Sequence, residues 1–329
     1  MLETGNSVQL SSTGEVFIAG GTNSATMPFT SGNDLTFNGG LADGFVAKLN
    51  PVNGNLIAGT FMGLGEYDQT YFVQLDLDDM VYVLGQTESD WGVSSGVYGI
   101  PNSGQFVRKY TNDLTTIEWT TMIGAGTGHV EISPTAFLVS DCYDIYLSGW
   151  GGQLNANASV SQAINSTSNG FPVTLDAYQP STNGSNFYIA VLNQDASYLK
   201  YGTYMGGTAS PYNHVDGGTS RFDKSGRIYH AVCGSCGNGV NNGFTATTGA
   251  WSETSNSPNC NMACFKFELN AIEAIVSDPE PYVCLPDPVL FTNNSTNGNF
   301  FFWDFGDNTT STDENTEHVY PGPGDYLVT

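Results

Sequence analysis

Short apolar segments that end in glycine recur along this chain, and each is followed at a distance by a second apolar segment. The first kind stands at Val16–Gly20, Val81–Gly85, Ile145–Gly149 and, without its glycine, Ile228–Ala231. The second kind stands at Phe45–Leu49, Phe106–Tyr110, Tyr188–Leu192 and Ala263–Phe267. A fixed order of strand-like segments at a period above about 40 residues indicates supersecondary units that bury their apolar faces against one another. We predict four small antiparallel sheets arranged radially, as the blades of a β-propeller.

The first unit displays the expected strands most clearly. They are Val8–Leu10, Glu15–Ala19, Phe45–Leu49 and Leu56–Phe61, with Asn53-Gly54 as the hairpin turn before the last strand. We place the units at residues 8–66, 71–128, 136–210 and 214–270, so that the propeller covers residues 1–270. Because propellers commonly have more than four blades, we expect these units to belong to a larger ring rather than to a small closed one.

Composition and charge narrow the class of protein. Forty glycines among 329 residues, with 40% hydrophobic residues, are typical of a packed β-rich chain with many tight turns. Acidic residues outnumber basic ones 32 to 8, and the net charge of -24 disfavours binding to nucleic acid and direct insertion into anionic membranes. No apolar run is long enough for a membrane helix, and Met1–Gly5 lacks the core of a signal peptide. The composition is nevertheless typical of an extracellular protein, so we expect its export signal to lie outside this fragment.

A different pattern follows the repeats. Residues 271–281 predict an extended linker, and residues 282–329 a second domain. Its segments Trp303–Asn308, His318–Tyr320 and Gly324–Val328 resemble the PKD domain. The resemblance implies an immunoglobulin-like β-sandwich, here truncated before its last strand, with Trp303 in its core and Asn308 at a left-handed turn position. The predicted fold class is therefore all-β, a propeller followed by a sandwich.

The repeats also resemble a known family. Residues 14–22 and 40–51 are similar to the bacterial SBBP β-propeller repeat. Such repeats followed by a PKD domain resemble large surface proteins of Bacteroidota that the type IX secretion system exports and that are associated with gliding motility. The resemblance implies type IX and outer-membrane machinery, together with surface glycans or proteins, as partners.

Four of the six cysteines lie in the fourth unit. Cys233 and Cys236, with Cys260 and Cys264, have roughly the spacing of a four-thiolate zinc site. The same residues fit disulfides between neighbouring strands, which would pair Cys233 or Cys236 with Cys260 or Cys264. The extracellular composition favours disulfides. Cys142 and Cys284 fit a bond with each other, bonds with partners outside this fragment, or no bond at all.

Acidic turns provide candidate calcium ligands, because several carboxylate oxygens on one turn suit this hard cation. Acidic residues in turns also stabilise the turn by accepting backbone hydrogen bonds, and this alternative stays open. We expect no cofactor other than calcium at these turns. The candidates are Asp76, Asp78 and Asp79 in the second unit, and Asp304 and Asp307 in the sandwich.

Tryptophans in the predicted loops are candidate ligand-binding residues, because indole faces stack well on sugars. They are Trp91, Trp150 and Trp251. In a propeller, large aromatic side chains also fill the space between neighbouring blades, and for each of the three we favour core packing.

The histidines give little sign of catalysis, because none of the four belongs to a recognised catalytic motif. His214 with the nearby Asp216 is the one candidate catalytic pair that the sequence offers, and we favour a role for this pair in stabilising a turn. We therefore predict a non-catalytic extracellular interaction or adhesion module, secreted by the type IX system and linked to gliding or surface attachment. The alternatives are an accessory carbohydrate-binding region of a secreted polysaccharide-degrading enzyme, and a purely structural spacer.

Overall fold

A computed structural model describes most of the chain. The described residues are 3–157, 162–207, 213–215, 220–224, 226–236, 244, 246–254, 257, 259–268, 275–277, 282–295 and 301–329. The chain forms two compact units, Met1–Phe267 and Glu268–Thr329. Among the described residues, nearly all regular structure is β, and no helix is long and apolar enough to cross a membrane. The predicted all-β fold class is confirmed.

The first unit contains successive antiparallel sheets, each with its strands in chain order. The first sheet consists of β1 (Glu3–Leu10), β2 (Val16–Thr22), β3 (Asp43–Leu49) and β4 (Leu56–Met62). The second consists of β5 (Asp68–Leu75), β6 (Val81–Thr87), β7 (Gln105–Tyr110) and β8 (Ile117–Ile123). The third consists of β9 (Ser133–Val139), β10 (Ile145–Trp150), β11 (Phe187–Leu192) and β12 (Leu199–Met205), with the short helix α1 (Gln153–Ala156) in its long loop. The fourth has three strands, β13 (Ser220–Phe222), β14 (Arg227–Gly234) and β15 (Asn261–Glu268).

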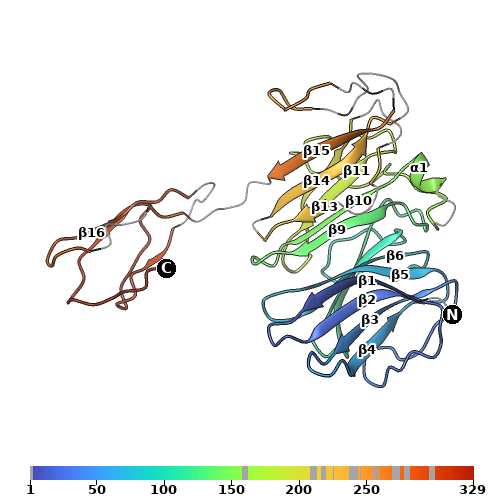
Figure 1. Cartoon of the computed structure of the whole chain (residues 1–329), viewed down its shortest axis with the longest axis horizontal. Helices are drawn as coiled ribbons and strands as arrows, with labels where there is room; N and C mark the ends of the chain where they lie inside the picture. The colour runs from blue at the N-terminus through green and yellow to red at the C-terminus, as the bar shows by residue number, and fades with distance from the viewer. Residues whose placement is uncertain are drawn as a thin grey trace. The chain divides into compact units, whose positions relative to one another are not determined.

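The hydrophobic core lies between the sheets, which follow one another in chain order in Figure 1. One cluster joins Phe17 and Val46 of the first sheet to Val73 of the second. A second cluster joins the second and third sheets, and a third cluster joins the third and fourth. Sheets of four antiparallel strands that pack face to face in sequence are the blades of a β-propeller.

The glycine that recurs near the end of the second strand of a repeat has a structural cause. In the first sheet, β1 contains a register shift between Gly5 and Ser7, opposite Gly20 of β2. A Cβ atom at Gly20 would lie 1.8 Å from the carbonyl oxygen of Thr4, so no larger residue fits without moving the backbone. Gly85 opposes a similar shift in β5, where its Cβ would lie 2.4 Å from the carbonyl oxygen of Gln69. The recurring glycine therefore allows an irregular first strand to pair closely with the second.

The first strands begin earlier than the sequence boundaries indicated. β1, β5 and β9 start at Glu3, Asp68 and Ser133, whereas the units were placed to begin at residues 8, 71 and 136. The early halves of β1 and β5 are polar, as in Asp68-Gln69-Thr70. An apolar pattern therefore could not reveal them.

The second unit pairs β16 (Val289–Phe291) with β19 (Thr316–His318), and β17 (Trp303–Asp304) with β18 (Thr310–Ser311). Among its described residues, the buried hydrophobic side chains are Phe291 and Phe305, whose ring centroids lie 5.5 Å apart. The ring of Trp303 packs on that of Phe291 with 5.8 Å between centroids, as expected for a core residue, but Trp303 is only half-buried and its indole nitrogen donates to the carbonyl oxygen of Asp313. Asn308 has a φ angle of 71°, which confirms the left-handed turn predicted for it.

Candidate functional site

A pocket of about 510 Å³ lies where the first strands of three sheets approach one another. It is lined by residues of the first, second and third sheets and of the loops beside them. The lining residues are Thr4, Gly21, Thr22, Asn23, Leu41, Ala42, Tyr67, Gln69, Tyr71, Gln86, Ser133, Gln162 and Ala163. The polar halves of β1 and β5 that the sequence pattern missed therefore form part of this wall.

Hydrogen bonds connect the polar side chains of the wall. The hydroxyl of Tyr67 lies 3.3 Å from that of Tyr71 and 3.3 Å from Oε1 of Gln86. Nε2 of Gln86 donates to the carbonyl oxygen of Ile132 at 2.8 Å, which ties the second sheet to the third. Nε2 of Gln69 donates to Oγ1 of Thr4 at 3.2 Å, which ties the second sheet to the first. The side chains are thus held in place by bonds to three sheets.

The pocket offers neutral polar groups. Burial raises the pKa of the Tyr67 phenol well above its usual range, and it also raises the pKa of Tyr71. Both phenols are therefore protonated at neutral pH and can donate hydrogen bonds. With the amides of Gln69 and Gln86, they present donors, acceptors and aromatic rings, a combination that suits an uncharged polar ligand.

The tryptophans singled out from the sequence lie elsewhere. Trp91 is half-buried, stacks on Phe106 at 4.1 Å between ring centroids, and has the Arg108 guanidinium 3.9 Å from its ring centre. Trp150 is half-buried against the core between the third and fourth sheets. Trp251 is fully exposed, so the core packing favoured for it is wrong. None of the three lines the pocket, and ligand binding by them stays a prediction.

The acids of the second sheet make protein contacts on a turn between β5 and β6. Asp76 accepts bonds from the backbone nitrogens of Asp78 and Met80, and from the hydroxyl of Tyr82 at 3.0 Å. Asp79 accepts two bonds from Ser12, in the turn between β1 and β2, through the backbone nitrogen and the hydroxyl of Ser12. Asp78 accepts a bond at 2.9 Å from the hydroxyl of Tyr143, in the turn between β9 and β10. These acids therefore connect three neighbouring sheets, and calcium binding by them stays a prediction.

The acids of the second unit also serve its turns. Asp304 accepts a bond from the backbone nitrogen of Gly306 at 3.0 Å. Asp307 accepts bonds from the hydroxyl and backbone of Thr309 and lies 2.8 Å from Nε2 of His318. These bonds, that from the Thr309 hydroxyl above all, lower the pKa of Asp307. The ring of His318 also stacks on that of Phe305, with 4.2 Å between the ring centroids.

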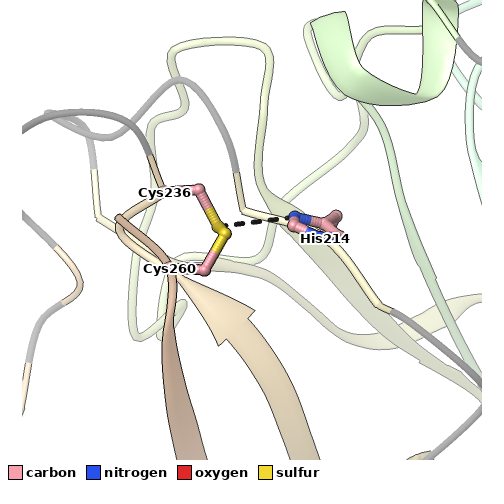
Figure 2. A group of neighbouring side chains, drawn as sticks. All are labelled: His214, Cys236 and Cys260. Carbon is pink, nitrogen blue, oxygen red and sulfur yellow. Dashed lines mark hydrogen bonds between the residues drawn. A yellow bond between two sulfur atoms is a disulfide. The ribbon is translucent and has the colours of Figure 1, made fainter. Parts of the chain in front are cut away.

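One disulfide links Cys236, just after β14, to Cys260, just before β15. It is one of the four pairings that the sequence allowed. Cys142, Cys264 and Cys284 form no disulfide, and Cys264 lies exposed on β15. His214 approaches the disulfide, with its Nδ1 3.6 Å from Sγ of Cys236 (Figure 2). Asp216, which the sequence paired with His214, lies outside the described residues.

The pocket residues had a weak sequence signal. Gly21 and Gln86 each directly follow the glycine that recurs near the end of the second strand of a repeat. Tyr67, Gln69 and Tyr71 alternate, so that they recur with the period of a strand. Neither signal identifies a pocket, because the strands that carry these residues meet only when the sheets pack side by side.

Comparisons with known proteins identify the C-terminal domain. Residues 278–329 match the model of the PKD domain. The C-terminal part of the chain is a PKD domain. Two similar solved structures are the β-propeller domain of the Trilobed protease from Pyrococcus furiosus and the Dos1 propeller. The first has a TM-score of 0.31 at 6% identity and covers 100% of this chain and 85% of its own. The second has a TM-score of 0.29 at 11% identity and covers 96% of this chain and 84% of its own. A search of curated proteins finds no match.

Proposed function

We propose that this chain is a non-catalytic binding module of an extracellular surface protein, and that the pocket between its first three sheets binds an uncharged glycan. The observation that carries the proposal is the lining of the pocket. Phenol and amide groups at its wall can bond to sugar hydroxyls, and tyrosine rings can pack against the C–H face of a sugar.

The extracellular setting has separate support. A PKD domain and a disulfide fit a protein that works outside the cell. A propeller joined to a PKD domain fits an interaction module in such a setting. A glycan ligand at a surface fits both an adhesin and an accessory region of a polysaccharide-degrading enzyme, and we favour the adhesin.

Binding to a glycan array tests the ligand. We expect the whole chain to bind a small set of neutral glycans, and the double variant Tyr67→Phe with Tyr71→Phe to bind them about tenfold more weakly. The reason is that each lost hydroxyl removes a hydrogen bond worth roughly 0.5–1.5 kcal/mol. The phenylalanines keep the rings, so the fold is expected to be unchanged.

Trp251→Ala is the matched control, because Trp251 is exposed and lies outside the pocket lining. Its binding should equal that of the unaltered chain. Loss of binding in this control, with none in the tyrosine variant, would move the ligand site to the loop of Trp251. A chain that binds no glycan at millimolar concentration would instead be a structural spacer.

The route of export is proposed from the repeat sequence, which resembles the SBBP repeats of Bacteroidota surface proteins. We propose export by the type IX machinery and a role in surface attachment or gliding. Comparing the cell surface of a producing strain with that of a strain lacking type IX secretion tests this. Equal amounts of the protein on both surfaces would contradict the proposal.

A further inference from the structure

The fourth sheet gathers three metal-ligand side chains from separate segments. A ring nitrogen of His214 and the sulfur atoms of Cys236 and Cys260 all lie within 4.8 Å of one another. Figure 2 shows His214 facing the Cys236–Cys260 disulfide. Two thiolates and an imidazole form a donor set that suits zinc, and the net charge of -24 attracts cations.

A fourth ligand is indicated by the backbone. His214 and Cys233 exchange two backbone hydrogen bonds of 3.0 Å, as directly opposed residues of an antiparallel pair do. Side chains of directly opposed residues leave the sheet on the same side. Cys233 therefore projects to the side of His214, and it is separated from Cys236 by the two residues typical of zinc-binding cysteine pairs.

We propose that the reduced form of this cluster binds one zinc ion through His214, Cys233, Cys236 and Cys260. The disulfide is the oxidised form of the same site. This ligand set differs from the four cysteines that spacing alone suggested, because His214 takes the place of Cys264. Cys264 lies on the exposed side of β15.

The change between the forms is a thiol–disulfide exchange. A dithiol supplies two electrons and two protons, the Cys236–Cys260 bond breaks, and the dithiol closes to a cyclic disulfide. Zinc then displaces the thiol protons as it binds the thiolates. The site would thus hold the segments before β13, after β14 and before β15 together in either redox state, by a covalent bond or by a metal ion.

Zinc titration of the whole chain tests the proposal. After anaerobic reduction with a dithiol and removal of the reagent, we expect one zinc ion per chain, measured against a chromophoric chelator. His214→Ala and Cys233→Ser should each weaken zinc binding at least tenfold. Cys264→Ser is the matched control and should bind zinc like the unaltered chain.

Cobalt spectra separate loss of a ligand from loss of the fold. Cobalt in the reduced chain should give thiolate charge-transfer bands and the visible bands of a tetrahedral site. His214→Cys should restore tetrahedral cobalt binding with stronger charge-transfer bands, whereas His214→Ala should not. Three results would overturn the proposal: a reduced chain without stoichiometric zinc, equal loss in Cys264→Ser and Cys233→Ser, or a disulfide that resists excess dithiol.

Discussion

Leu10 and Leu75 end the first strands of two neighbouring sheets, yet they differ sharply in burial. Leu75 of the second sheet is 8% exposed, because it packs in the cluster that joins this sheet to the first. Leu10 of the first sheet is 65% exposed. Leu75 pairs with Val81, and Leu10 pairs with Val16. Each partner is the first residue of the following strand, so the two leucines hold the same place in the repeat.

The fourth sheet shows the same contrast in burial, on the face that is turned away from the third sheet. Phe17, Tyr82 and Tyr146 hold the second position of β2, β6 and β10, and all are buried. Phe17 and Tyr82 belong to the clusters shared with the next sheet, and Tyr146 packs against Phe222 of β13. Tyr229, the second residue of the matching repeat segment Ile228–Ala231 in β14, is 43% exposed. At these two positions of the repeat, the copies that pack against another sheet are buried, whereas Leu10 and Tyr229 are exposed.

Truncating the two leucines should give the largest difference in stability between the two sheets. We expect Leu75→Ala to lower the free energy of unfolding by about 2–5 kcal/mol, because it leaves a cavity between two sheets. The matched change Leu10→Ala should alter it by no more than about 0.5 kcal/mol. Denaturant unfolding followed by tryptophan fluorescence measures both. Equal losses would mean that Leu10 is covered in solution.

Lowering the pH tests whether water is excluded from the face of the fourth sheet that packs against the third sheet. Burial lowers the pKa of His230 to about 4, and its ring lies 4.8 Å from that of Phe265. The unfolded chain takes up this proton near pH 6.5, before the folded chain does. The titration of His230 therefore leaves the free energy of unfolding unchanged above pH 6.5. Between pH 6.5 and 4 it lowers the free energy of unfolding by about 3 kcal/mol in total.

His230→Gln should remove this part of the pH dependence. His129→Gln is the control, because His129 is exposed and should leave the unfolding profile unchanged. Thermal unfolding between pH 7.5 and 4 provides the measurement. An NMR titration that places the pKa of His230 near 6.5 would show that the inner face is open to water.

Contacts between the turns should give the smallest effect. Ser12→Ala removes the hydroxyl bond to Asp79, and Tyr143→Phe removes the bond to Asp78. Each should cost about 1 kcal/mol or less, because these bonds are exposed to water. Tyr198→Phe is the control, since its hydroxyl forms no hydrogen bond among the described residues. Denaturant unfolding measures the free energy of unfolding of all three variants. A loss above about 2 kcal/mol in Ser12→Ala or Tyr143→Phe would contradict the expectation that these bonds contribute little to stability.

Much of the fold was predictable from local patterns. The runs from Val16 to Gly20 and from Phe45 to Leu49 form strands as expected, and Trp303–Asn308 marks the PKD domain. The pocket was not predictable in the same way. Tyr67, Gln69 and Gln86 belong to polar stretches, and only the packing of three sheets brings them together.

The cysteines illustrate the same limit. Their spacing indicated a pairing or a metal site but left four pairings open, and His214 was not among the proposed zinc ligands. The backbone pair between His214 and Cys233 joins residues that are far apart in the chain.

By itself, the sequence determined where strands and turns form, because alternating apolar residues, hairpin glycines and left-handed turn residues act over a few positions. Tertiary structure decided which copies of a repeat position are buried, which polar groups share a pocket and which histidine meets the cysteines. Those outcomes depend on neighbours supplied by other sheets, and a local pattern carries no record of them.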